Sequence, residues 1–200
     1  LLRGYIAQET TRRPLFYDLL AALYHERNAK PMALSLLAAG VSLYPDNPQL
    51  FFEYGLMLDK NGMEEQAMDK MLRVLELQPD HADALNFIGY TWADKNIRLN
   101  EALQYIEKAV ALKPDNGYIV DSLGWIYYRL GDYQRAVKEL HRALELEPDD
   151  PNIREHLGDA YRRLGNTSQA LTHYKKAIEM FADEARKNQV EEKINALKNQ

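Results

Sequence analysis

Apolar positions along this chain recur in a pattern with a period of about 34 residues. In each copy a small residue, a large apolar residue and a second small residue follow one another at helical spacing. The sets are Ala33, Leu37, Gly40; Ala67, Met71, Val74; Ala102, Ile106, Ala109; Ala136, Leu140, Ala143; and Ala170, Tyr174, Ala177. Small residues let two helices approach closely, and the large one fills the gap between them. Strand-like alternation is absent, so the pattern predicts an all-α protein.

A glycine precedes four of these sets. Gly55, Gly89, Gly124 and Gly158 stand 34, 35 and 34 residues apart, and Ala21 takes this place in the first copy. A period of this size indicates one supersecondary unit copied along the chain. Such solenoids offer long concave binding surfaces more often than catalytic pockets.

Two kinds of helix end divide each copy. Residues that tolerate left-handed backbone stand between its two apolar runs, at Asn28, Gly62, Asn96, Gly131 and Gly165. A Pro-Asp pair follows the second run in four copies, beginning at Pro45, Pro79, Pro114 and Pro148. The longer interval places an extra residue in the 94–100 turn. We therefore expect five helix-turn-helix units, at 14–47, 48–81, 82–116, 117–150 and 151–184.

The two ends of the chain lie outside these units. Residues 1–13 are expected to be the remnant of a preceding repeat or helix, or alternatively a poorly ordered end. Because residue 1 is Leu, we expect the natural N-terminus to lie upstream. Val190, Ile194 and Leu197 fall at helical spacing, which predicts a capping helix at 185–200, with a partner-binding helix as the alternative.

These positions resemble the tetratricopeptide repeat (TPR) family over about residues 14–184. The most complete copy carries Val120, Leu123, Gly124, Tyr127, Ala136, Leu140, Ala143 and Pro148. The last copy departs from the pattern, with Ala182 in place of the closing proline. The resemblance implies a right-handed α-solenoid of tandem TPR units with a C-terminal capping helix. It also implies a non-catalytic scaffold or adaptor that binds a protein or peptide in a concave groove.

Composition narrows the function further. The net charge of −5 opposes a general nucleic-acid role, because phosphate binding depends on Lys and Arg. Cysteine is absent, which excludes disulfides and thiol chemistry, and no apolar run is long enough to predict a membrane span. The sequence has no glycine-rich phosphate loop, no histidine pair at metal-binding spacing and no nucleophile beside a base. We therefore expect no enzyme activity, no metal and no cofactor.

The resemblance implies that the first helix of each unit lines the groove. Asp18, Ala22, His25 and Leu56 are among the expected lining residues of the first two units. The residues that we expect to bind a partner are Phe52, Asn86, Tyr90, Tyr118, Asp121, Trp125, Tyr128, Arg129, Glu155, Asp159, Arg162 and Arg163.

The fourth unit carries the strongest of these candidates. Tyr118, Trp125 and Tyr128 are aromatic where a purely structural repeat can carry any polar residue. Aromatic residues beside arginine dominate binding hot spots, and Arg129 and Arg162 are expected close by. Alternatively, Trp125 and Tyr128 pack against the neighbouring repeat.

Some family members grip a peptide carboxylate with Lys and Asn side chains. The matching positions here hold Asp18, Ala22, Asp83 and Phe87, so a co-chaperone that binds chaperone tails is disfavoured. The phrases around Gly89, Gly124 and Gly158 are similar to bacterial TPR proteins that are often exported or lipid-anchored, some of them adaptors of envelope enzymes. This favours the periplasmic side of a bacterial envelope. Two alternatives stay open: a regulatory or substrate-binding domain of a larger enzyme, and a self-assembling homo-oligomer.

Overall fold

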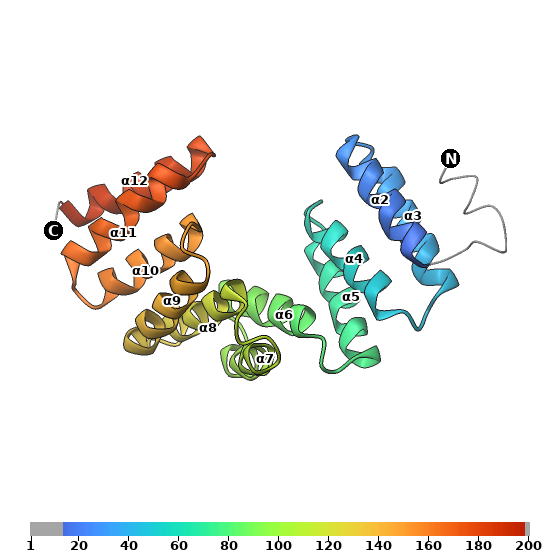
Figure 1. Ribbon diagram of the computed structural model, residues 1–200, viewed down its shortest axis with the longest axis horizontal. Coiled ribbons are helices and arrows are strands. Elements are labelled where there is room, and N and C mark those ends of the chain that lie inside the picture. Colours follow the sequence, from blue (N-terminus) through green and yellow to red (C-terminus); the bar gives the residue numbers. More distant parts are fainter. Residues whose placement is uncertain (1–13, 199–200) are drawn as a thin grey trace. The chain divides into compact units, whose positions relative to one another are not determined.

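The computed structural model describes residues 14–198, in which every regular element is an α-helix (Figure 1). The helices are α2 (Pro14–Glu26), α3 (Lys30–Leu43), α4 (Pro48–Asp59), α5 (Glu64–Leu77), α6 (Ala82–Asp94), α7 (Leu99–Leu112), α8 (Gly117–Arg129), α9 (Tyr133–Leu146), α10 (Pro151–Arg163), α11 (Thr167–Met180) and α12 (Glu184–Lys198). Each expected unit contains two of them, and the all-α prediction is confirmed. The expected remnant at 1–13 lies outside the described residues.

The turns inside the units have the backbone that the sequence predicts. Left-handed residues end the first helix of each pair, at Asn28, Gly62, Asn96, Gly131 and Gly165. The longer 94–100 turn has a second left-handed residue, Arg98 with φ 48°, directly before α7. The sequence did not reveal this residue. At the start of α4, the Asn47 side chain accepts a hydrogen bond from the Leu50 amide at 3.0 Å, which caps the helix.

The two helices of a unit meet where the recurring glycine faces a large side chain. A Cβ atom added at Gly124 would lie 2.5 Å from Leu140 Cγ, and one added at Gly158 would lie 2.5 Å from the Tyr174 ring. The small residues of the second helices, such as Ala136, are fully buried. The predicted small and large positions therefore form the cores of the units.

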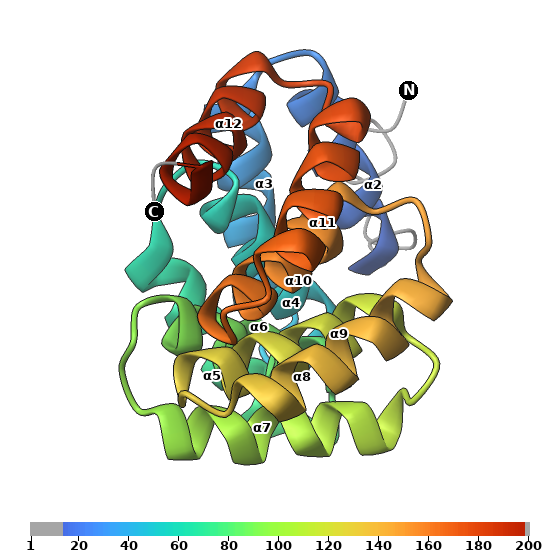
Figure 2. The ribbon, with the colours of Figure 1, turned by 90° about the vertical axis from the view of Figure 1, so that its left-hand side faces the viewer.

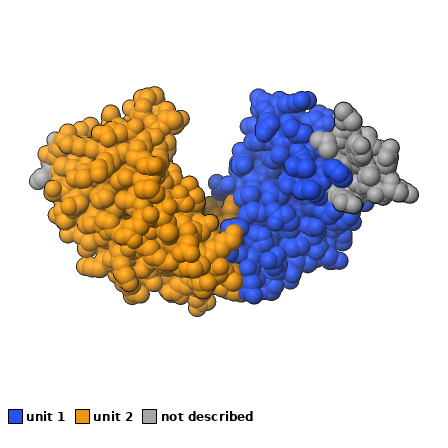
Figure 3. Space-filling view, viewed as in Figure 1, with its two compact units in different colours: residues 1–84 blue, residues 85–200 orange. Residues whose placement is uncertain are grey.

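The described residues fall into two compact units, one ending at Ala84 and the other beginning at Leu85 (Figure 3). We call them the first and the second compact unit, because each contains several helices and is larger than one helix-turn-helix unit. In the first, Tyr17, Leu37 and Leu50 belong to one buried cluster. In the second, α8 packs against α7 and α9 (Figures 1 and 2).

The C-terminal helix α12 belongs to the core of the second compact unit. Its residues Val190, Ile194 and Leu197 are buried in one cluster with Tyr174 and Phe181. The helix begins at Glu184, one residue before the predicted segment. The amphipathic pattern therefore marks the side of α12 that packs against α11.

Gly124→Ala tests the close approach of α8 and α9. We expect the new methyl group to lower the unfolding free energy by about 1–3 kcal/mol, since crowding in a packed core costs that much. Urea unfolding followed by circular dichroism measures the change.

The control is the same substitution in a Leu140→Ala background. Leu140→Ala alone should cost about 2–5 kcal/mol, and Gly124→Ala should then cost less, because the crowding side chain is gone. Equal costs in both backgrounds would contradict the proposed contact.

Candidate partner-binding groove

Trp125 is enclosed by its neighbours. Its side chain is 9% exposed. The ring stacks on Tyr128 at 4.8 Å between centroids and on His156 at 4.4 Å, and the Arg129 guanidinium lies 5.7 Å from its centroid. These contacts agree with the alternative in which Trp125 packs against the neighbouring repeat. The exposed aromatic residue of α8 is Tyr118, at 55%.

His156, one ring of this stack, also forms a largely buried ion pair that joins α10 to α8. His156 Nδ1 lies 2.9 Å from Asp121 Oδ1 and 3.1 Å from Oδ2. Burial opposes protonation of His156, but the charge and hydrogen bond of Asp121, with the charges of Asp159 and Glu155, outweigh it and raise the His156 pKa. Asp121 is therefore paired within the fold.

The acids Glu155 and Asp159 on α10 are 5% and 4% exposed and contact α12. Arg186 donates to Glu155 at 2.7 Å, and Lys193 donates to Glu155 at 2.7 Å and to Asp159 at 2.6 Å. The Tyr174 hydroxyl also donates to Asp159, at 2.6 Å. Charge on these two acids is thus compensated by residues of the chain itself.

The sequence predicted that α12 caps the last repeat through its apolar side. It did not predict the ion pairs that Arg186 and Lys193 of this helix form with α10. A signal was present, because Lys193 follows Asp159 by 34 residues, one repeat period. The same spacing separates Arg186 from Asn152, whose side-chain oxygen accepts a hydrogen bond from the Arg186 guanidinium at 3.4 Å. The C-terminal helix thus makes its polar contacts at the offset expected of a following repeat.

The remaining arginines border the stacked rings. Arg162 lies 3.9 Å from Asp159, while the exposed Arg163 lies over the Tyr133 ring at 4.9 Å. Tyr133 in turn contacts Tyr128, with centroids 5.6 Å apart. Rings and guanidinium groups therefore form a continuous surface from α8 to α10.

The other expected residues lie on α4 and α6. Burial, followed by the charges of Asp94 and Asp121, raises the pKa of Tyr90 to about 12, so its hydroxyl stays protonated. The half-buried Asn86 has a buried side-chain oxygen without a hydrogen-bond partner among the described residues. Phe52 belongs to the first compact unit, where its ring lies 4.7 Å from that of His81.

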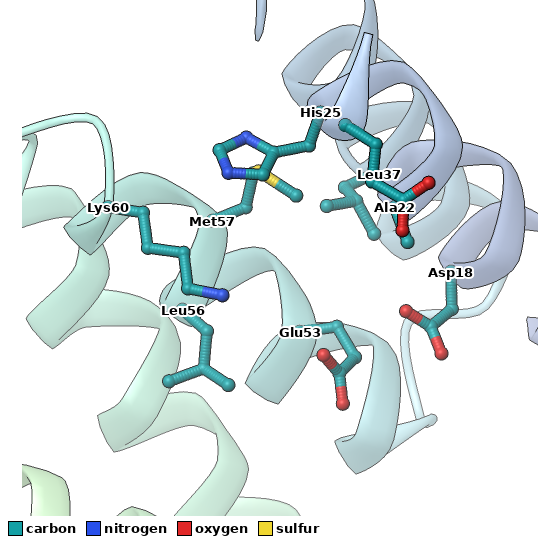
Figure 4. A pocket seen from close by; sticks show the side chains of 9 residues that line it. Asp18, Ala22, His25, Leu37, Glu53, Leu56, Met57 and Lys60 are labelled. Carbon is teal, nitrogen blue, oxygen red and sulfur yellow. The ribbon is translucent and has the colours of Figure 1, made fainter. Parts of the chain in front are cut away.

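The first compact unit holds a cavity of about 220 Å³ between α2 and α4 (Figure 4). Four of the expected groove residues line it: Asp18, Ala22, His25 and Leu56. Sequence reasoning missed the other five, Glu26, Leu37, Glu53, Met57 and Lys60.

Two classes of feature are not found in residues 14–198. No group of three or more His, Asp or Glu side chains there is arranged to hold a metal ion. None of the helices in this range combines the length and the apolar character that crossing a bilayer requires.

Comparisons with known proteins agree with this architecture. The tetratricopeptide repeat family model matches residues 122–185. TPR repeat-containing protein PA4667 of Pseudomonas aeruginosa is 36% identical over 125 residues, which cover 62% of this chain and 21% of that protein. The matched residues and the repeat pattern show that the chain contains tetratricopeptide repeats.

Two further proteins are similar to the TPR chain, one in sequence and one in fold. Human protein O-mannosyl-transferase TMTC1 is 29% identical over 126 residues, 61% of this chain and 14% of that protein. A tetratricopeptide repeat protein from Parabacteroides merdae has a solved structure with a TM-score of 0.79, at 16% identity, covering 99% of this chain and 78% of that one. This likeness shows the shared fold. The TPR chain spans about a fifth of PA4667 and about a seventh of TMTC1.

The buried Asp121–His156 pair predicts a pH dependence of stability. Since the folded state raises the His156 pKa above its ordinary 6.5, the pair contributes its full stability below that pH. The contribution is lost as pH rises through the raised pKa. The unfolding free energy of His156→Gln, measured in urea, should therefore differ most from wild type in mild acid and least in alkali.

His173 supplies the control with the opposite sign. Burial first, and the charges of His141, Arg154 and Lys176 next, lower its pKa to about 4. Because the folded protein binds a proton at His173 less readily than the unfolded chain does, the unfolding free energy falls as the pH drops from 6.5 towards 4. His173→Gln should remove this part of the pH dependence. A constant difference between wild type and His156→Gln across the whole range would refute the pairing.

Proposed function

We propose that this TPR chain is a non-catalytic adaptor that binds a protein or peptide partner on the aromatic and arginine surface of its second compact unit. The single observation that carries the proposal is the exposure of Tyr118 on the helix face that also carries Trp125 and Arg129. Tyr118 is 55% exposed, and residues seven and eleven positions apart share a helix face. Tyrosine and arginine together are typical of interaction hot spots.

Partner chemistry follows from the charges that remain accessible. Glu155 and Asp159 are paired with cations of α12, whereas Arg163 is exposed and the half-buried Arg129 lies over the Trp125 ring. The proposed partner therefore brings acidic groups to the two arginines and an apolar or aromatic group to Tyr118. A bacterial envelope, on its periplasmic side, is the proposed location, and it rests on the resemblance of the glycine phrases.

A second candidate function is a binding domain within a larger enzyme. The match to the transferase TMTC1, which covers 14% of that protein, favours it. In this case the same surface holds either the substrate of the enzyme or another part of its chain. Reading the complete gene separates the two candidates.

The test replaces Tyr118 and Arg129 by alanine and measures recovery of partners from source cells. We expect the recovered amount of the main partner to fall at least tenfold, because hot-spot residues each contribute more than about 1 kcal/mol to binding. Trp125 is left intact, since a buried tryptophan cut to alanine costs about 3–5 kcal/mol of stability.

The matched control is Lys138→Ala, a side chain 81% exposed on α9. It should recover the partner as wild type does. Equal recovery by the folded double variant and wild type would overturn the proposed surface. If the recovered protein is only the chain itself, the surface is a self-assembly interface instead of an adaptor site.

A further inference from the structure

Three carboxylates, Asp18, Glu26 and Glu53, line the cavity of the first compact unit, whereas Lys60 is its single lysine. Asp18 on α2 and Glu53 on α4 both line it (Figure 4). The Asp18 side chain makes no ion pair or hydrogen bond with another described residue. Glu53 accepts a hydrogen bond from Gln49 at 2.6 Å, but this neutral donor leaves its charge in place.

The pKa values report this lack of compensation. Burial raises the pKa of Asp18. Burial and the Asp18 charge raise the pKa of Glu53, and they outweigh the opposite effects of Gln49 and Lys60. The two acids thus repel one another inside a partly dehydrated cavity, where a cation between them relieves the repulsion.

The rest of the lining is suited to an aliphatic stem. Leu37 and Met57 are buried, and Leu56 completes an apolar wall beside the two acids. His25 also lines this cavity, and its Nδ1 atom is shielded from solvent without a hydrogen-bond partner among the described residues. Because no metal-binding group of three side chains is found in 14–198, the lining does not suit a bare divalent cation.

A second cavity of about 200 Å³ shares Asp18. Pro14, Leu15 and Leu50 give it apolar walls. Leu15 is 59% exposed, so a hydrophobic surface lies open next to the acidic one. An occupant with a basic residue near an apolar residue matches both cavities.

We propose that the first compact unit binds a lysine or arginine side chain of a protein partner, with the cation between Asp18 and Glu53 and the stem along Leu56 and Met57. An apolar neighbour in the partner lies on the exposed Leu15. The site is in a different compact unit from the surface built on Tyr118, and it stands or falls independently of it.

The experiment titrates two acetylated, amidated peptides into the ¹⁵N-labelled full chain. One contains Leu-Lys and the other Leu-norleucine, which keeps the stem and lacks the charge. We expect the lysine peptide to shift the amide signals of Ala22, His25 and Leu56, and the norleucine peptide to bind at least fivefold more weakly. Equal affinities, or shifts confined to other regions, would overturn the proposal.

Variants of the two acids and of Lys60 test the residues directly. Asp18→Asn and Glu53→Gln should each weaken the lysine peptide about fivefold or more, because each removes one carboxylate from the cation. Lys60→Gln should strengthen it, because it removes the cation that already lines the cavity. Asp69→Asn, an exposed acid on α5, is the matched control and should change nothing.

Two further measurements test whether the cavity binds a metal ion instead and whether it acts independently of the Tyr118 surface. If Mg²⁺ alone shifts the cavity signals and the lysine peptide does not, the proposed occupant is wrong. The Tyr118 and Arg129 double variant should bind the lysine peptide as wild type does. The peptide titration therefore tests the cavity even if the proposed adaptor surface is wrong. A loss of binding in that variant would contradict the independence of the two sites.

Discussion

In four of the five helix-turn-helix units, the close approach of two helices at a glycine is the contact on which the rest of the unit depends. At Gly158 the missing Cβ leaves room for the Tyr174 ring, which would lie 2.5 Å from an added methyl group. The ring position brings its hydroxyl within 2.6 Å of Asp159. Asp159 in turn accepts a hydrogen bond from Lys193 on α12. Packing at one glycine thus fixes the position of a buried charge, and the charge helps to hold the terminal helix.

The two compact units differ in how the charges of their acidic residues are compensated. In the second, Glu155 is buried and contacts both Arg186 and Lys193. In the first, Asp18 and Glu53 share a cavity in which burial and mutual repulsion raise the pKa of Glu53. A buried acid is stable when its partner comes from the same chain, and it favours an external cation when no such partner exists. This difference is the physical reason for assigning separate binding chemistry to the first compact unit.

The sequence predicted the helices and their turns well, because both depend on local and repeated patterns. Gly131 ends a helix as any residue with easy left-handed backbone does, and Ala136 is small because a neighbouring helix lies against it. Side-chain pairing is less predictable. The enclosure of Trp125 depends on His156, which lies one repeat away, and the periodic pattern assigns no partner to either ring. The cations of α12 were missed for the same reason, although the 34-residue offset of Lys193 from Asp159 marked one of them.

Amide hydrogen exchange in α12 tests most directly whether charge pairing makes this helix part of the second compact unit. Lys193→Met keeps most of the side-chain stem and removes the charge that Glu155 and Asp159 share. Opening of α12 should then become at least tenfold more frequent, while exchange in α8 and α9 stays unchanged. We predict slow amide exchange in wild-type α12 and faster exchange in the Lys193→Met variant. Rapid exchange in wild-type α12, or equal exchange in the two proteins, would contradict the account.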